Sequence, residues 1–295
     1  MNILDTVKKL LPRFLLRYLS QYRRHWVFAL PDFLRAKRRV MSSVELTDDE
    51  RELLDHVSLE VHVADSMYIP GHAYHYLSVG LSAIRCISAA IRCSRLPHQI
   101  DTVLDFPCGY GRVLRFLRRM FPSAHITAAE ICGNALDFCG RAFSTTPLLS
   151  ATNFDELAFP QRFDLIWCGS LLTHIDESSA IDLLRFFHDH LSERGLCIFT
   201  AHGRRSIDII QDQERSYGLT NDARRKITSE FQKTGYGYAD YPNQSGYGIS
   251  VASRERMIEL AKSVGGWSET LFIEHGWDNH QDVYAFATQM LNNRL

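Results

Sequence analysis

Hydrophobic and polar positions alternate regularly from about residue 101 onward. Short apolar runs rich in β-branched and aromatic side chains are separated by stretches with helical periodicity. The pattern predicts strands at 102–106, 125–130, 147–152, 163–168 and 196–201. It predicts helices between them at about 111–120, 133–144 and 177–191. Strands that alternate with helices in this way indicate a parallel sheet covered by helices on both faces.

The chain departs from this alternation between Arg204 and Tyr247. A charged helical stretch there precedes the glycine- and tyrosine-rich segment GYGYADYPNQSGYG, which we expect to form a loop. A helix at 253–264 and strands at about 267–275 and 282–288 complete the pattern. Because no internal repeat or low-complexity linker interrupts the chain, we treat the sheet and its additions as one domain.

Basic residues are concentrated at the start of the chain. Residues 1–42 carry ten lysines and arginines against two aspartates, a local charge of +8 that leaves −9 for the rest of a chain of net charge −1. From Pro12, a favoured first helical residue, apolar side chains lie on one arc of a helix and arginines on the opposite arc. The simpler interpretation is a helix that packs on its own domain or on a partner subunit, and the alternative is a helix on an anionic membrane surface. Nucleic acid ranks behind both, because we find no nucleic-acid motif and the rest of the chain is acidic.

Composition narrows the class of protein. A chain of 295 residues with 45% hydrophobic content is long enough for one large domain with a full core. Its seven cysteines include no CxxC pair and mostly occupy apolar segments, which favours a reducing compartment and argues against bound zinc. No apolar run approaches the roughly 18 residues that span a bilayer, and the start of the chain lacks a signal-peptide pattern. We therefore expect a cytoplasmic protein, peripheral to the inner face of the membrane if the basic segment binds lipid.

The segment VLDFPCGYGRVLRFL, residues 103–117, carries the clearest binding signal. It predicts a buried strand that ends on an acid, a turn with two glycines and an amphipathic helix. Such a turn brings backbone N–H groups close to a nucleotide-like ligand. Glu130, at the tip of the next strand, is placed to accept hydrogen bonds from ribose hydroxyls. Pro107 stands where a glycine is usual, and it fits only if the turn needs neither a positive φ nor an N–H at that position.

From about Tyr76 to Thr288 the sequence resembles the class I S-adenosylmethionine-dependent methyltransferases. The resemblance is carried, in family order, by the segments VLDFPCGYGR, ITAAEI, FDLIWCGSLLTHID and ERGLCIFTAHGR and by the closing pair of strands. It implies a Rossmann-like, seven-stranded, mostly parallel sheet with an antiparallel last strand. We expect a basic helical extension at 1–45, a helical lead-in that covers the cofactor at 46–100 and a core at 101–295, with a substrate-side insert at about 204–250.

The resemblance also implies a set of residues that bind S-adenosyl-L-methionine. Asp105 and the backbone around Cys108, Gly109 and Gly111 would hold the methionine end. Glu130 would bind the ribose. The remaining contacts implied are adenine at Asn153 and Phe154, the methionyl group at Cys168 and Gly169, and a cover formed by Tyr76 and Gly80.

Histidines follow three strands at the edge where parallel sheets bind ligands. His174 follows the fourth strand, His202 follows the fifth, and His280 lies in GWDNHQD between the last two. We expect one of them, His280 or His174 ahead of His202, to act as the general base for a hydroxyl acceptor, oriented by Asp176 or Asp282. A His–Asp metal site is the alternative.

The acceptor is less clearly marked. The aromatic faces of Tyr236, Tyr238, Tyr241, Tyr247 and Trp277 suit a sugar ring, although these side chains also suit simple packing. The arrangement loosely resembles methyltransferases of bacterial surface polysaccharide or glycolipid synthesis. We expect O-methylation of such a glycan precursor, and a small natural product is the alternative acceptor. An oxidoreductase on a similar sheet and a catalytically silent cofactor-binding module are the competing functions.

Overall fold

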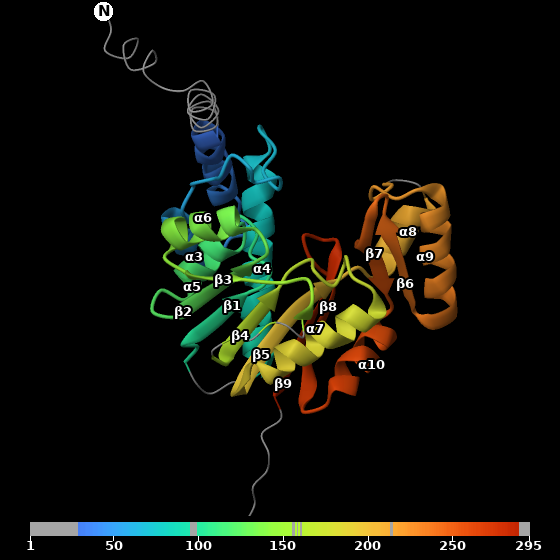
Figure 1. Ribbon diagram of the computed structural model, residues 1–295. Helices are drawn as coiled ribbons and strands as arrows, with labels where there is room; N and C mark the ends of the chain where they lie inside the picture. The colour runs from blue at the N-terminus through green and yellow to red at the C-terminus, as the bar shows by residue number, and fades with distance from the viewer. Residues whose placement is uncertain are drawn as a thin grey trace, which may run out of the picture.

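The computed structural model describes residues 29–94, 99–154, 157, 159, 161–212 and 215–288. A seven-stranded sheet in the order β3-β2-β1-β4-β5-β9-β8 runs through its centre (Figure 1). The strands are β1 (Thr102–Asp105), β2 (His125–Glu130), β3 (Thr146–Leu149), β4 (Phe163–Cys168), β5 (Leu191–Ala201), β8 (Trp267–Trp277) and β9 (Gln281–Thr288). Neighbouring strands from β3 to β5 are parallel, and β9 is antiparallel to both β5 and β8. This confirms the expected seven-stranded sheet with an antiparallel last strand.

Helices cover both faces of this sheet, as the alternating pattern predicts. The helices α4 (Ala73–Ser94), α5 (Leu114–Met120) and α6 (Gly133–Phe143) share one core with it, and α7 (Glu177–Asp189) and α10 (Arg254–Val264) share the other. Side chains of β4 alternate between the cores: Trp167 lies in the first, and Ile166 and Cys168 lie in the second. Burial on both faces explains why the strand reads as a continuous apolar run.

The predicted boundary between α7 and β5 is wrong by about five residues. The helix ends at Asp189, and β5 begins at Leu191 rather than at 196. The first residues of β5 carry the polar sequence SER, which has no strand pattern. Pairing of Leu191 with Phe163 extends the strand nevertheless.

The insert after β5 is a small layer of its own, seen at the right of Figure 1. It consists of α8 (Arg204–Gln211), α9 (Asn221–Thr234) and an antiparallel hairpin of β6 (Tyr236–Tyr241) and β7 (Gln244–Ala252). The expectation of a loop over the tyrosine-rich segment is therefore wrong. A separate small core, which includes Ile210, Ile227 and Ile249, joins these elements.

The part of the basic N-terminal region that the structure describes packs on its own domain. Residues 29–41 are helical, and Phe33 on that helix is fully buried. The Asp32 carboxylate accepts hydrogen bonds from the Tyr68 hydroxyl and from the Gly71 and Ala73 amides, at 2.9–3.2 Å. The short helix α3 (Asp48–His56) follows. The predicted amphipathic helix from Pro12 lies mostly outside the described residues.

One helix in the described part of the chain, α4, is long and apolar enough to cross a membrane by length and composition alone. The sequence pattern did not single it out. Half of its apolar window is buried inside the fold, where α4 packs against α5 and β8. These contacts are those of a core helix.

Candidate active site

The turn between β1 and α5 forms the first half of the site. Gly109 and Gly111 have φ angles of +51° and +80°, a left-handed conformation that glycine adopts without steric cost. A Cβ at Gly111 would overlap the Phe143 ring, whereas nothing lies within 4 Å of a Cβ built at Gly109. The Phe106–Pro107 peptide bond is cis. The turn therefore leaves open space beside the Gly109 backbone, where a ligand can approach.

Glu130, at the end of β2, is bonded to this turn. Its carboxylate accepts hydrogen bonds from the Gly109 amide at 3.0 Å and from the Ile131 amide at 2.8 Å. A carboxylate offers about four acceptor positions. Because these two amides use only part of that capacity, the half-buried carboxylate can still accept from a pair of hydroxyl groups.

Asp105, the last residue of β1, is a buried acid without a partner. Its side chain is 1% exposed, and Oδ2 makes no hydrogen bond among the described residues. Burial, reinforced by the charge of Glu130, raises the pKa of Asp105 well above its usual range. A cationic group bound beside the turn would balance this carboxylate.

Cys108 in the turn and Cys168 at the end of β4 are packing groups. Cys108 and Cys168 are both buried, and Cys108 bonds the Gly109 carbonyl at 3.3 Å through its thiol. A hydrogen bond with Cys139, together with burial, raises the pKa of the Cys108 thiol. Burial raises the pKa of Cys168 as well. Both side chains therefore stay as neutral thiols at pH 7.

Phe154, Asn153 and Gly169 are three further residues that were predicted to contact the cofactor. Phe154 lies at this end of the sheet, with its ring centroid 6.4 Å from that of Phe106, and Asn153 beside it is exposed. After β4, a Cβ added to Gly169 would lie 2.9 Å from the Trp277 ring. Close packing with Trp277 thus accounts for Gly169.

Tyr76 and Gly80, the predicted cover, lie in the core on α4. Tyr76 is 1% exposed, and its hydroxyl donates to Asp65 at 2.7 Å and accepts from Arg115 at 3.1 Å. A Cβ at Gly80 would overlap the Phe116 ring. Helix packing explains both residues, and we leave them out of the site.

The structure brings the three predicted histidines together from three separate segments. The ring centroids of His174 and His202 are 6.5 Å apart, and those of His202 and His280 are 5.3 Å apart. The expected topology explains this convergence, because the segments after β4 and β5 and the turn between β8 and β9 meet at one edge of the sheet.

Strand β7 fixes two of these rings. His174 Nδ1 lies 2.8 Å from the Gly248 carbonyl oxygen, and His202 Nδ1 lies 3.2 Å from that of Ser250. A carbonyl oxygen only accepts, so Nδ1 carries the proton in both neutral rings. The basic lone pair of each is then on Nε2, which makes no hydrogen bond among the described residues.

The three histidines are neutral at pH 7. Burial lowers the pKa of His174, and it lowers the pKa of His202 to about 3, with help from the charges of His280 and His174. Burial also lowers the pKa of His280, and the nearby Arg215 and Arg205 lower it further. A neutral ring is the form that accepts a proton. His202 is the weakest base of the three, because its pKa lies furthest below neutrality.

The two predicted orienting carboxylates bond backbone groups instead of the histidines. Asp176 caps α7 and accepts from the Ser179 amide at 2.8 Å. Burial opposes its ionisation, but the hydrogen bonds from Ser179 and Ser178 lower the pKa of Asp176. Asp282 is buried and accepts from the His275 amide at 2.8 Å. Both carboxylates therefore hold backbone segments in place and do not orient the three histidine rings.

Aromatic rings surround the histidine cluster. Tyr247 stacks on His174 with ring centroids 4.9 Å apart, and the Tyr241 hydroxyl is 3.3 Å from His174 Nδ1. The Tyr217 hydroxyl is 3.2 Å from His280 Nε2. Tyr217 was not predicted, because it lies between α8 and α9 in a segment without periodicity or motif.

The remaining predicted aromatics pack within the fold. Tyr236 and Trp277 are 5% and 3% exposed, with hydrogen bonds to the carbonyls of Ile175 and Val79. The hydroxyl of Tyr238 donates to Asp240 in its own strand. Of the five aromatics that were expected to meet an acceptor, only Tyr241 and Tyr247 contact the histidines.

Tyr247 is next to the histidines and feels the charge of Glu130. Its ring stacks on His174. Burial and the negative charge of Glu130 raise the pKa of Tyr247. The turn after β1 and the segments that carry His174 and His202 all follow the carboxyl ends of parallel strands, so they lie at the same edge of the sheet.

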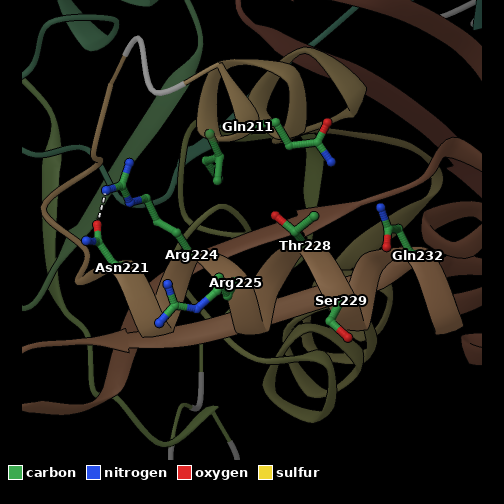
Figure 2. A pocket seen from close by; sticks show the side chains of 8 residues that line it. Gln211, Asn221, Arg224, Arg225, Thr228, Ser229 and Gln232 are labelled. Carbon is green, nitrogen blue, oxygen red and sulfur yellow. Dashed lines mark hydrogen bonds between the residues drawn. The ribbon is translucent and has the colours of Figure 1, made fainter.

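A second open region lies on the insert and shares no residue with this site. A groove of about 590 Å³ between α8 and α9 is lined mostly by polar side chains (Figure 2). Figure 2 shows Asn221 and Arg224 joined by a hydrogen bond at one end of the groove and Gln232 at the other. Across the described ranges, no group of three or more histidine, cysteine, aspartate or glutamate side chains is arranged to hold a metal ion.

Comparison with known proteins assigns the first part of the sheet, from β1 to the start of β5, and its turn to a family. Residues 103–195 match the family described as "Methyltransferase domain". These residues are a methyltransferase domain of the class I S-adenosylmethionine-dependent family. The cofactor of this domain is S-adenosyl-L-methionine.

Two curated relatives are named malonyl-[acyl-carrier protein] O-methyltransferase. The protein from Bacteroides fragilis is 24% identical over 132 residues, which cover 45% of this chain and 26% of that protein. The protein from Bacillus cereus is 21% identical over 176 residues, which cover 58% of each. The chain thus spans less than two thirds of the length of these relatives.

A solved structure supports the same fold. DesVI from Streptomyces venezuelae superposes with a TM-score of 0.51 at 14% identity, covering 78% of this chain and all of that one.

The site residues of the methyltransferase domain fit its cofactor. The unpartnered carboxylate of Asp105 suits the positively charged methionine end, and the open space at Gly109 leaves room for it. Glu130 retains acceptor positions for the ribose hydroxyls. Phe154 supplies an apolar face at the same end of the sheet.

Proposed function

We propose that the chain is an S-adenosylmethionine-dependent O-methyltransferase whose acceptor lies between the β1–α5 turn and the histidine cluster. The observation that carries this proposal is the convergence of His174, His202 and His280 from three segments beside the cofactor turn. A single buried histidine is commonly structural, but three neutral rings at the ligand-binding edge of a methyltransferase domain supply the base that a hydroxyl acceptor needs.

When bound, S-adenosyl-L-methionine supplies an electrophilic methyl group on its sulfonium sulfur. Asp105 would hold its methionine end and Glu130 its ribose, which would align that methyl group with the acceptor. His174 is the preferred base, because its Nδ1 is bonded to Gly248 and its Nε2 lone pair is free to take the acceptor proton. His280 is the second choice.

We propose a sugar hydroxyl, on a glycolipid or polysaccharide precursor, as the acceptor. Support comes from Tyr241 and Tyr247, which place aromatic faces and hydroxyl groups around His174. Aromatic faces with polar edges suit a sugar ring.

A carboxylate acceptor is the second candidate. The names of the two curated relatives favour it, since a malonyl group offers a carboxylate oxygen to an O-methyltransferase. A carboxylate is ionised at pH 7, so its methylation needs positioning and no base. A small natural product would be a hydroxyl acceptor or a carboxylate acceptor, according to which of its oxygen atoms is methylated.

The N-terminal charge supports a further proposal on location. We propose that the enzyme works in the cytoplasm and that the basic segment 12–42 contacts the membrane or a second copy of the chain. A location at the membrane would bring the enzyme close to a lipid-linked acceptor.

The experiment combines binding with product analysis. Calorimetry should show binding of S-adenosylhomocysteine and none of NAD. Labelled S-adenosylmethionine, incubated with the enzyme and fractionated cell extract, should transfer label to lipid-linked or free sugar. Label in an acyl ester would favour the carboxylate candidate, and binding of NAD alone would contradict the whole assignment.

The base is tested by replacing His174, His280 and His202 with glutamine in turn. Each variant should keep its affinity for S-adenosylhomocysteine, while the base variant loses about 10²- to 10⁴-fold in turnover. If all three keep near-native turnover on a hydroxyl acceptor, no histidine acts as the base.

A further inference from the structure

Two arginines of the insert lie beside the histidine cluster and are not explained by the mechanism above. The guanidinium carbon of Arg215 is 5.9 Å from the centre of the Tyr217 ring. That ring lies nearly parallel to His280, at 16° and 6.0 Å between centroids. Arg205, in the first turn of α8, contributes with Arg215 to the positive field at His280.

Arg205 and Arg215 are both exposed, and neither forms an ion pair with any residue that the structure describes. The nearby acid Asp278 lies within electrostatic reach of Arg215, but its ion pair is with His75, at 3.7 Å. Placing an exposed arginine next to a neutral histidine costs little free energy, because water solvates the guanidinium group. An anion that replaces this water forms charge-assisted hydrogen bonds with the arginine.

The start of α8 is connected to this place through Ser206, but this end of the helix already faces an acid. A Cβ added to its N-cap, Gly203, would overlap the carboxylate of Asp282. Ser206 in the first turn accepts a hydrogen bond from the Tyr217 hydroxyl at 3.3 Å, which connects the helix to Tyr217 and His280.

A buried polar group also faces this place. His202 is 4% exposed, and its ring lies 5.3 Å from His280 and 5.4 Å from Tyr217. With Nδ1 bonded to Ser250, Nε2 has no partner among the described residues. A ligand bound beside Tyr217 and His280 would therefore meet a polar atom that the protein itself leaves unbonded.

We propose that Arg215 and Arg205 form a subsite for an anionic group of the acceptor. This inference rests on the proposed function and extends it, because it defines the acceptor as a molecule that carries a phosphate or a carboxylate near the oxygen to be methylated. Arginine recognises both groups through paired, charge-assisted hydrogen bonds.

The two sources of negative charge differ in size and shape. A diphosphate of a nucleotide-linked or lipid-linked sugar can engage both arginines at once. The carboxylate of an acyl group can engage one arginine in a bidentate pair. Pyrophosphate and malonate are probes for these two sources.

The test is calorimetric titration of each probe into the full chain saturated with S-adenosylhomocysteine, at low salt. One probe should bind, and Arg215→Ala should raise its dissociation constant about 10- to 100-fold, the effect of a lost charge-assisted contact. Arg205→Ala should weaken binding as well. The matched control is Arg225→Ala, an exposed arginine of α9 in the separate groove, which should stay within about twofold of the wild-type chain.

The outcomes separate this inference from the proposed function. Binding of pyrophosphate identifies a phosphorylated acceptor, and binding of malonate identifies a carboxylate. If S-adenosylhomocysteine binds but neither probe does, or if Arg215→Ala and Arg205→Ala bind the probe as the control does, the anion subsite is wrong and the methyltransferase assignment stands. If S-adenosylhomocysteine does not bind, the proposed function itself fails.

Discussion

Asp105 is a buried acid whose Oδ2 has no hydrogen-bond partner among the described residues. Its folded-state pKa is raised, so a proton binds the folded state more tightly than the unfolded state. The corresponding stability is present below the unfolded pKa and is lost as the pH rises through the folded pKa. Burial of this acid therefore destabilises the ligand-free protein at pH 7, and we expect a bound cationic group to relieve the cost.

Replacing Asp105 with asparagine should make the ligand-free protein more stable and should weaken its binding of S-adenosylhomocysteine. We expect the free energy of unfolding at pH 7 to rise by about 1–3 kcal/mol, because the neutral amide removes an ionisable group whose burial costs free energy above the pKa of the unfolded chain. Affinity for S-adenosylhomocysteine should fall about tenfold or more, because the charge that faces the methionine end is lost. Urea unfolding and calorimetry measure the two effects. Asp137→Asn, an exposed change on α6, should alter neither, and a parallel loss of stability and affinity would contradict this account.

His202 should make stability depend on pH. Its pKa is about 3 in the folded protein and about 6.5 in the unfolded chain, so the unfolded state binds more protons between these values. The stabilisation is complete above pH 6.5 and is lost as the pH falls toward 3, and it amounts to about 2 kcal/mol between pH 7 and pH 5. In His202→Gln, the difference in unfolding free energy between these two pH values should shrink by that amount. An unchanged difference would show that His202 is solvated, and His56→Gln at the surface is the control.

At the level of elements, the insert touches the main domain through β6 and β7. One face of β6 presents Tyr236 and Tyr238 to the main core, and Ala239 on the other face enters the small core of the insert. Gly237 lies directly against the backbone of Ile227 in α9, where a Cβ would overlap the carbonyl group. The absence of a side chain at this position is what allows α9 to pack on the hairpin.

Gly237→Ala should loosen the insert and leave the cofactor half intact. We expect a loss of about 1–3 kcal/mol in local stability, as for other overpacked positions, because the carbonyl of a helix cannot move aside cheaply. Hydrogen exchange in α9 and β6 should increase, and turnover should fall with S-adenosylhomocysteine affinity unchanged. Gly133→Ala is the matched control, since nothing lies within 4 Å of its added Cβ. Equal rates of hydrogen exchange in the Gly237→Ala and Gly133→Ala variants would show that the contact between Gly237 and Ile227 does not stabilise the insert.

The hairpin also shows what the sequence can and cannot predict. The parallel strands, the turn at Gly109 and the meeting of three histidines follow from strand periodicity and motif order, and the antiparallel last strand follows from the family resemblance. The segment YGYADY does alternate with period two, but its glycines and tyrosines resembled a loop. Tyr217 and Arg215 could not be found, because they join the site through the tertiary position of an irregular segment. The roles of Asp176 and Asp282 depend on backbone amides, which sequence does not locate.

At the scale of the whole molecule, charge separates the N-terminal region from the rest of the chain. If residues 12–42 bind an anionic membrane, vesicles with acidic lipid should capture the full chain, and capture should fade as salt rises, since surface charge is screened beyond about 8 Å at physiological ionic strength. Neutral vesicles should capture much less. Sedimentation with the two kinds of vesicle measures this, and equal binding to both, or to neither, would favour packing against protein.

The insert has a small hydrophobic core of its own, separate from the two cores that hold the sheet. Side chains around Tyr217, Tyr241 and Tyr247 can therefore change during evolution while the residues that bind the methyl donor stay folded and unaltered. In such an architecture new acceptors are acquired by rebuilding one peripheral layer. Related chains are then expected to diverge most in the insert and least in the turn after β1.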